Sequence, residues 1–174
     1  MSSPAPTSDP ETASSKINYG DAEVQFGMGL KFATDAGAAQ DYGQAAEWYH
    51  KAAEQNHSLA QFNLGVMYAQ GQGVARDAAQ SAMWFGKAAQ LGDAGAQYRL
   101  GDHCQRASFE QAPAEALESR IEAYKWYRLA AAQGYQDSEK AWVTLSLNMT
   151  RADVVAGNQR VAAFEIGKPN SPQE

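Results

Sequence analysis

The sequence predicts an all-α protein built from repeated pairs of helices, and three observations lead to that fold class. Ala supplies 34 of the 174 residues, whereas Ile and Val together supply 10; Ala is the best helix former, and β-branched residues favour strands. Every proline except Pro113 lies near one of the two ends of the chain, so the middle can be helical almost throughout. One residue pattern also recurs along the chain, which is typical of repeat architectures.

The repeat is visible because aromatic residues, glycines and tryptophans keep a common spacing. Successive members of the aromatic set and of the glycine set are 36 positions apart, and the tryptophans are separated by 36 and then by 42 positions. The third unit therefore carries an insertion of six residues between its two halves. The recurring positions are Phe26, Phe62 and Tyr98, then Gly29, Gly65 and Gly101, and then Trp48, Trp84 and Trp126.

This spacing divides the chain into a repeat array between two short ends. The Pro-, Ser- and Thr-rich start and the polar tail are expected to be disordered. Residues 19–164 form the array, with a half unit and a capping helix at its end. The predicted segments are the N-terminal segment 1–18, the units 21–57, 58–93, 94–135 and 136–149, the capping helix 150–164 and the tail 165–174.

Unit two shows why each repeat should contain two helices. Ser58 is a candidate N-cap for the first helix. Leu64, Met67 and Tyr68 recur at three and four residues, so they share one helical face. The glycines that follow at positions 71 and 73 end this helix. Asp77 can cap the second helix, and Gly92 fits a left-handed conformation at its C-terminal end.

A glycine inside each first helix points to a close helix crossing. Gly65 costs about 1 kcal/mol relative to Ala in a helix interior, and Gly29 and Gly101 repeat that cost in the other units. A residue without a Cβ lets the second helix approach closely. The tryptophans at positions 48, 84 and 126 are expected to be core residues.

The third unit and the C-terminal part predict three further helices. Pro113 suits the first position of a helix, and nothing breaks the helical pattern up to Gln133, so we expect one helix of about 20 residues. Residues 136–148 should form a helix with Trp142 and Leu145 facing inward. Thr150 can cap a last helix that covers the end of the array. The apolar stripe expected on that helix consists of Val154, Val155, Val161 and Ala162.

Unit two combines apolar, glycine and tryptophan positions in one pattern. Its residues are Ala60, Phe62, Leu64, Gly65, Tyr68, Gly71, Gly73, Val74, Asp77, Ala82, Trp84, Lys87, Ala88, Ala89 and Gly92. This pattern resembles the Sel-one-like repeat family, a relative of the tetratricopeptide repeat. The resemblance covers about residues 21–164, and it implies an α/α superhelix, a right-handed solenoid of about three and a half helix pairs with a concave face. It also implies an adaptor or scaffold that binds a protein or peptide partner.

A partner would lie against the first helix of each unit, because those helices line the concave side of stacked helix pairs. A mixture of aromatic residues and separated charges suits an extended or helical peptide. Two simpler interpretations stay open. Phe26, Phe62 and Tyr98 can instead be core residues that pack between helices. Arg99 and Asp102 can pair with each other. The predicted partner-binding residues are Phe26, Leu30, Phe62, Asn63, Val66, Tyr98, Arg99, Asp102, Lys140 and Thr144.

The sequence lacks the common motifs of catalytic, metal-binding and phosphate-binding sites. It has no zinc-protease H-E-x-x-H, no C-x-x-C and no phosphate-binding G-x-x-x-x-G-K-[ST]. His103 and Cys104 are adjacent but lack further ligands at metal-binding spacing. Cys104 takes the place of Tyr68 in its unit, so a buried and inert thiol is expected. We therefore expect no catalytic residue, no metal and no cofactor.

Composition excludes other classes of partner. With 14 basic and 20 acidic residues the net charge is −6, so nucleic acid is not an expected partner. No apolar run of about 18 residues exists, so membrane insertion is not expected either. The sequence shows no signal peptide and has a single cysteine, which favours the cytoplasm. The alternative is an exported protein whose signal has been trimmed.

The main functional hypothesis is a non-catalytic adaptor, expected to be a monomer. One alternative is a hydrolase of the β-lactam-binding type, because some cysteine-rich relatives in this family are associated with β-lactam binding. The chain lacks their paired cysteines and any S-x-x-K motif. Another alternative is a self-associating spacer that makes contact through the long helix between Pro113 and Gln133.

Overall fold

The computed structural model describes residues 18–34 and 41–167, and every regular element in these two ranges is an α-helix. The all-α prediction is therefore confirmed for the described residues. The segments expected to be disordered, apart from Asn18 and residues 165–167, lie outside them. The helices are α1 (Ala22–Thr34), α2 (Tyr42–Glu54), α3 (Ser58–Gln70), α4 (Ala78–Gln90), α5 (Ala94–Ala107), α6 (Pro113–Ala132), α7 (Ser138–Ser146) and α8 (Arg151–Ile166).

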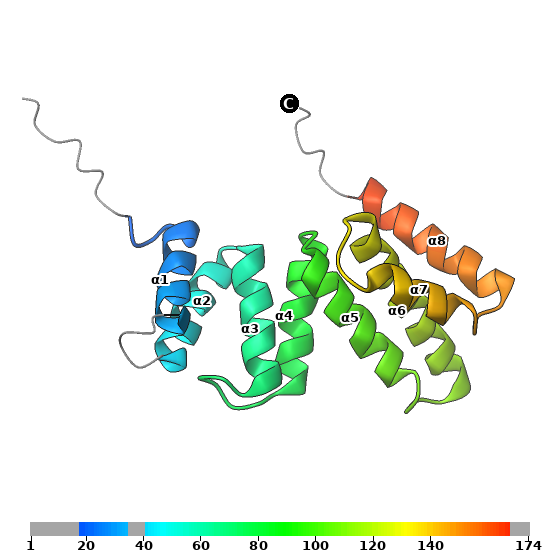
Figure 1. The fold of residues 1–174 in the computed structure, drawn as a ribbon, viewed down its shortest axis with the longest axis horizontal. Coiled ribbons are helices and arrows are strands. Elements are labelled where there is room, and N and C mark those ends of the chain that lie inside the picture. Colours follow the sequence, from blue (N-terminus) through cyan, green and yellow to red (C-terminus); the bar gives the residue numbers. More distant parts are fainter. Residues whose placement is uncertain (1–17, 35–40, 168–174) are drawn as a thin grey trace, which may run out of the picture.

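The helices follow one another in a row from α1 to α6, and α7 and α8 lie beside α6 at the C-terminal end (Figure 1). α1 packs on α2, α3 on α4 and α5 on α6, and adjacent pairs meet through α2 with α3 and α4 with α5. This is the repeat array of helix pairs that the 36-residue spacing predicts. Each pair buries part of its apolar surface against the next pair, as expected for a solenoid.

The close crossing predicted at the repeated glycines is confirmed. A Cβ placed on Gly65 would lie 2.6 Å from the Phe85 ring of α4, and Gly29 and Gly101 meet Tyr49 and Tyr127 in the same way. Each first helix thus uses a glycine to admit an aromatic ring from the second helix of its own pair.

Two of the predicted N-caps are confirmed and one is wrong. Asp77 accepts hydrogen bonds from Ala79 and Gln80 at the start of α4, and Thr150 forms a capping box at the start of α8. The N-cap of α3 is His57 and not Ser58, because His57 Nδ1 accepts the backbone N–H of Ala60 at 3.2 Å. Its other ring nitrogen lies 3.0 Å from a carboxylate oxygen of Glu23 on α1.

Buried glutamines tie the first helices of units two and three to the end of the preceding pair. The side chain of Gln61 donates to the Ala53 carbonyl at 3.0 Å, and Gln97 donates to the Ala89 carbonyl at 3.2 Å. Both glutamines are at most 1% exposed. Each of these carbonyls also accepts a backbone N–H, from Asn56 or Gly92, so the glutamine adds a second hydrogen bond at the junction between repeats.

The long helix of unit three is confirmed as α6, which spans 20 residues. The last helix, α8, packs on α6, the second helix of the last full pair, but partly through other residues than expected. Val155 is 48% exposed and Ala162 is exposed, so the predicted stripe is wrong at these two positions. The packed face instead includes Val154 and Val161 together with Gly157 and Phe164.

The contacts of α8 give the physical reason for that difference. A Cβ at Gly157 would lie 2.4 Å from the Tyr124 ring, so α8 approaches α6 as closely as the paired helices approach each other. Arg160 then bridges Glu118 at 2.6 Å and Glu122 at 2.8 Å. Glu118 belongs to the part of α6 that exceeds the 13 residues of α4. The longer helix therefore provides the surface on which α8 lies.

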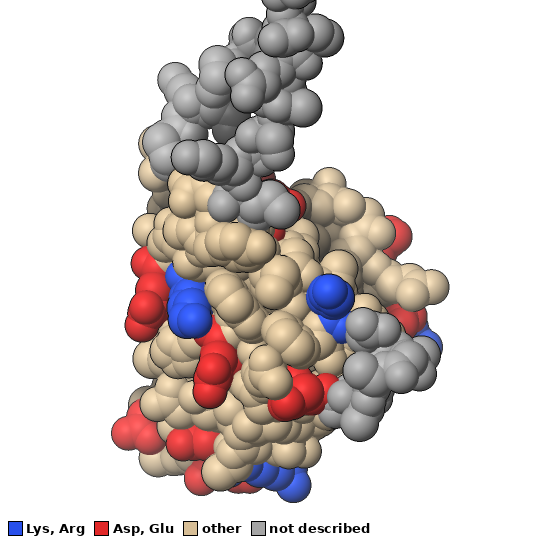
Figure 2. Space-filling view, turned by 90° about the vertical axis from the view of Figure 1, so that its left-hand side faces the viewer, with Lys and Arg blue, Asp and Glu red and all other residues tan. Residues whose placement is uncertain are grey.

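The opposite end of the array, formed by α1 and α2, carries scattered charges of both signs on a largely uncharged surface (Figure 2). Tyr19 and Leu30 are 56% and 44% exposed there. Charge is therefore not concentrated on the face seen in Figure 2, in contrast to the pocket described below.

Replacing Gly65 with Ala should lower the free energy of unfolding by about 1–3 kcal/mol, because the new methyl group overlaps the buried Phe85 ring. Gly86→Ala in α4 is the matched control: a Cβ there meets nothing within 4 Å, so helix propensity should stabilise this variant by up to about 1 kcal/mol. Urea denaturation of both variants measures the two changes. Equal stability of both variants would contradict the close crossing.

Candidate functional site

A pocket with a cavity volume of about 270 Å³ opens between α3, the segment that precedes α4, α4 itself and α5. It joins the helix pair of unit two to the first helix of unit three. Its uncharged side comes from α3 and α4 and its basic side from α5 and the segment before α4. The uncharged lining residues are Val66, Ala69, Gln70, Ala78, Ser81, Ala82 and Phe85.

The floor of the pocket is held by the helix crossing at Gly65. The ring of Phe85 rests against that glycine and lies 5.6 Å from the Phe62 ring. Ser81 is buried, and its hydroxyl donates to the Gly65 carbonyl oxygen at 2.8 Å. Packing and hydrogen bonding therefore fix the floor before any ligand arrives.

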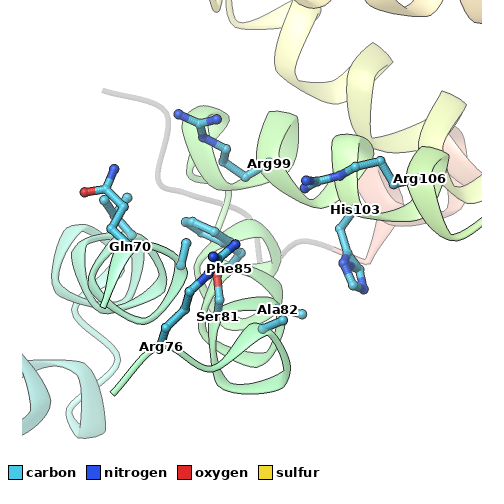
Figure 3. Close-up of a pocket in the computed structure, with 11 residues that line it drawn as sticks. Gln70, Arg76, Ser81, Ala82, Phe85, Arg99, His103 and Arg106 are labelled. Carbon is cyan, nitrogen blue, oxygen red and sulfur yellow. The ribbon is translucent and has the colours of Figure 1, made fainter. Parts of the chain in front are cut away.

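The basic side consists of three arginines and a histidine. Arg99, His103 and Arg106 lie along one side of α5, and Arg76 stands across the opening near Ser81 (Figure 3). None of the three arginines forms an ion pair with another described residue. Their guanidinium groups are therefore available to an anionic ligand.

His103 contributes little positive charge at neutral pH. Burial lowers its pKa, and the charge of Arg106 lowers it further. The positive charge of the pocket accordingly comes from the arginines, which stay protonated at any physiological pH. Arg106 is oriented in part by its Nε, which donates to the Asp102 carbonyl oxygen at 3.3 Å.

Two of the residues predicted from sequence, Val66 and Arg99, line this pocket. The three predicted aromatic residues pack between helices, as the simpler interpretation held. Phe26 stacks on His57 with 4.5 Å between ring centroids, and Tyr98 lies 5.5 Å from the Tyr127 ring. Phe62, beside Phe85, belongs to the same kind of contact.

The other predicted residues lie elsewhere. Asp102 does not pair with Arg99; its carboxylate accepts the Tyr127 hydroxyl at 2.8 Å, and burial together with this hydrogen bond raises the pKa of Tyr127. Asn63 is half-buried beside Tyr49 of α2. The remaining three, Leu30 on α1 and Lys140 and Thr144 on α7, are exposed outside the pocket.

The sequence analysis missed Arg76, His103 and Arg106. A signal for part of this set was present, because residues 99, 103 and 106 follow one another at four and three positions and so share one helical face. Arg76 belongs to the segment between two helices, and its place opposite α5 depends on the packing of one unit against the next.

Cys104 has the environment expected of an inert thiol. It is half-buried, and burial, with a smaller effect from Glu122, raises its pKa to about 11. Across residues 18–34 and 41–167 no three His, Cys, Asp or Glu side chains gather as metal ligands would. None of the helices in these ranges has both the length and the apolar character needed to cross a bilayer.

Stacked helix pairs with a pocket at a junction between units define an α-solenoid repeat protein, a fold typically used for protein interactions. A family model for the Sel1 repeat matches residues 22–57, 58–93 and 94–135. The chain therefore belongs to the Sel1 repeat family.

Solved structures agree with this assignment. A protective antigen of uropathogenic Escherichia coli with an SLR fold is 25% identical, with a TM-score of 0.66 over 89% of this chain and 34% of the antigen. A Sel1 repeat protein from Oxalobacter formigenes is 32% identical, with a TM-score of 0.59 over 72% of this chain and 90% of that protein. The chain thus spans about a third of the antigen's length. No curated protein matches it.

The raised pKa of Cys104 predicts slow alkylation. A thiol with a pKa of about 11 has roughly 200-fold less thiolate at pH 8 than an ordinary cysteine. Alkylation by iodoacetamide, followed by mass spectrometry, should be slow in the native protein, should accelerate about tenfold per pH unit, and should be fast in guanidinium chloride. Equal rates for native and unfolded protein at pH 8 would show that burial does not control this thiol.

Proposed function

We propose that this protein is a non-catalytic adaptor that binds a segment of a partner polypeptide at the pocket between α3, α4 and α5. The observation that carries the proposal is that the pocket lies at the junction of two repeats. Units two and three both contribute side chains to it. A site at such a junction can be extended along the neighbouring units, which suits a chain-like ligand better than a compact one.

The chemistry of the lining supports binding more than catalysis. Ser81 is the hydroxyl-bearing residue among the lining side chains, and its hydroxyl is buried and donates to a backbone carbonyl. A serine nucleophile needs an adjacent base that takes its proton, and this hydrogen bond directs the proton to Gly65 instead. Arginines, which dominate the basic side, bind anions and do not titrate at neutral pH.

Photo-cross-linking tests this proposal. A photoreactive amino acid in place of the exposed pocket residue Ala69 should cross-link to a partner protein in cells that naturally contain this protein. The same substitution at the exposed Glu47 of α2, which lies outside the pocket, should give no cross-link to that partner. Analysis by gel and mass spectrometry distinguishes the two positions, and a partner captured equally at both would contradict a pocket-directed interaction.

We also propose that the adaptor acts as a monomer. The long helix that a self-associating spacer would use is occupied within the chain, since α6 packs on α5, α7 and α8. Light scattering after size exclusion should therefore give about 18.8 kDa at every loading concentration. A mass that rises with concentration would favour the spacer function over the monomeric adaptor.

A further inference from the structure

We propose that the segment bound in the pocket is acidic, with two Asp or Glu side chains that face Arg99 and Arg106. This inference rests on the proposed function and adds the chemistry of the partner. The whole chain has a net charge of −6, yet three of its seven arginines line this one cavity. Such a local excess of positive charge favours an anionic ligand and repels a cationic one.

The arginines are free to bind. Arg76, Arg99 and Arg106 are exposed and have no ion-pair partner among residues 18–34 and 41–167. A guanidinium group presents paired N–H donors that match the two oxygens of a carboxylate. Each arginine can thus bind one carboxylate without breaking an existing ion pair of the protein.

The positions on α5 set a spacing for the ligand. Arg99 and Arg106 are seven residues apart on one helix, which corresponds to about 10 Å along its axis. In an extended polyproline-type segment, residues three apart share one face and lie about 9 Å apart. Acidic side chains at positions i and i+3 of an extended segment would therefore reach the two arginines together.

The floor adds a preference for apolar contact. Val66, Ala69, Ala82 and Phe85 line the cavity between the arginines. Its volume of about 270 Å³ is slightly below the roughly 300–1,000 Å³ of pockets that enclose small molecules. The space thus suits a few side chains of a segment that passes over the surface, with a small apolar residue between the acidic ones.

Charge outside the pocket favours a peptide over a nucleic acid. The phosphate backbone needs an extended track of basic residues, whereas this chain has 20 acidic against 14 basic residues. The end of the array seen in Figure 2 carries scattered charges of both signs. The acidic excess of the chain therefore disfavours a long polyanion more than it disfavours a short acidic segment.

Fluorescence anisotropy with defined probes tests this inference. Labelled deca-glutamate should bind the full chain, deca-glutamine should not, and raising the salt concentration should weaken the binding. The variant Arg99→Gln/Arg106→Gln should bind deca-glutamate at least tenfold more weakly, since two charge-assisted contacts are lost. Circular dichroism checks that this variant is folded. The variant Arg99→Lys/Arg106→Lys keeps the charge but not the paired donors, so its affinity for deca-glutamate should lie between those of the wild type and the Gln variant.

The matched control is Lys31→Gln/Arg151→Gln, which removes the same charge from exposed positions on α1 and α8. It should retain binding within about twofold. Equal loss in both double variants would overturn the proposal, because the effect would then follow net charge and not the pocket. Tighter binding of labelled dT10 than of deca-glutamate would also overturn it, in favour of phosphate recognition.

The outcomes also separate this inference from the adaptor function. A partner that still cross-links at Ala69 after Arg99→Gln/Arg106→Gln, together with no binding of deca-glutamate, would refute the acidic ligand and leave the adaptor function standing. Arginine-dependent binding of deca-glutamate without any cross-link in cells would refute the adaptor function and support the charge preference of the pocket.

Discussion

The contact between a helix glycine and an aromatic ring is the constraint on which this structure depends. It occurs in each of the three full units, and Gly65 with Phe85 is the example that also forms the pocket floor. Glycine weakens a helix, so its use at the same position of these three units indicates that close packing outweighs helix propensity. A fourth such contact, between Gly157 and Tyr124, fixes α8 on α6. One type of packing thus builds both the repeats and their C-terminal cover.

The helices could be predicted from the sequence because the features that determine them are local. The helix pairs, the 20-residue α6 and the glycine crossings could each be read from spacing and turn residues. The N-cap at His57 was missed because histidine is not among the usual N-cap residues, although Asp93 occupies the same place one repeat later. The packed face of α8 was predicted only in part because it depends on contacts with Tyr124 and Glu118, which are far away in sequence.

The pocket was predictable only in part, for the same reason. Val66 and Arg99 lie on first helices, whose exposed faces follow from periodicity. The basic stripe of α5 was also visible in principle, since its three members share one helical face. Arg76 belongs to a segment between helices, and only the stacking of unit three on unit two brings it opposite that stripe. A site at a junction between repeats therefore contains residues that no single repeat reveals.

The buried glutamines have a consequence for how long the pocket persists. Gln97 joins α5 to the end of α4 through the Ala89 carbonyl, across the same junction at which the pocket opens. In linear arrays, local opening starts at the termini, where units have one neighbour, and the central junctions open last. A binding surface placed at an internal, hydrogen-bonded junction is thereby sheltered from end fraying. It keeps its shape until the central units come apart together.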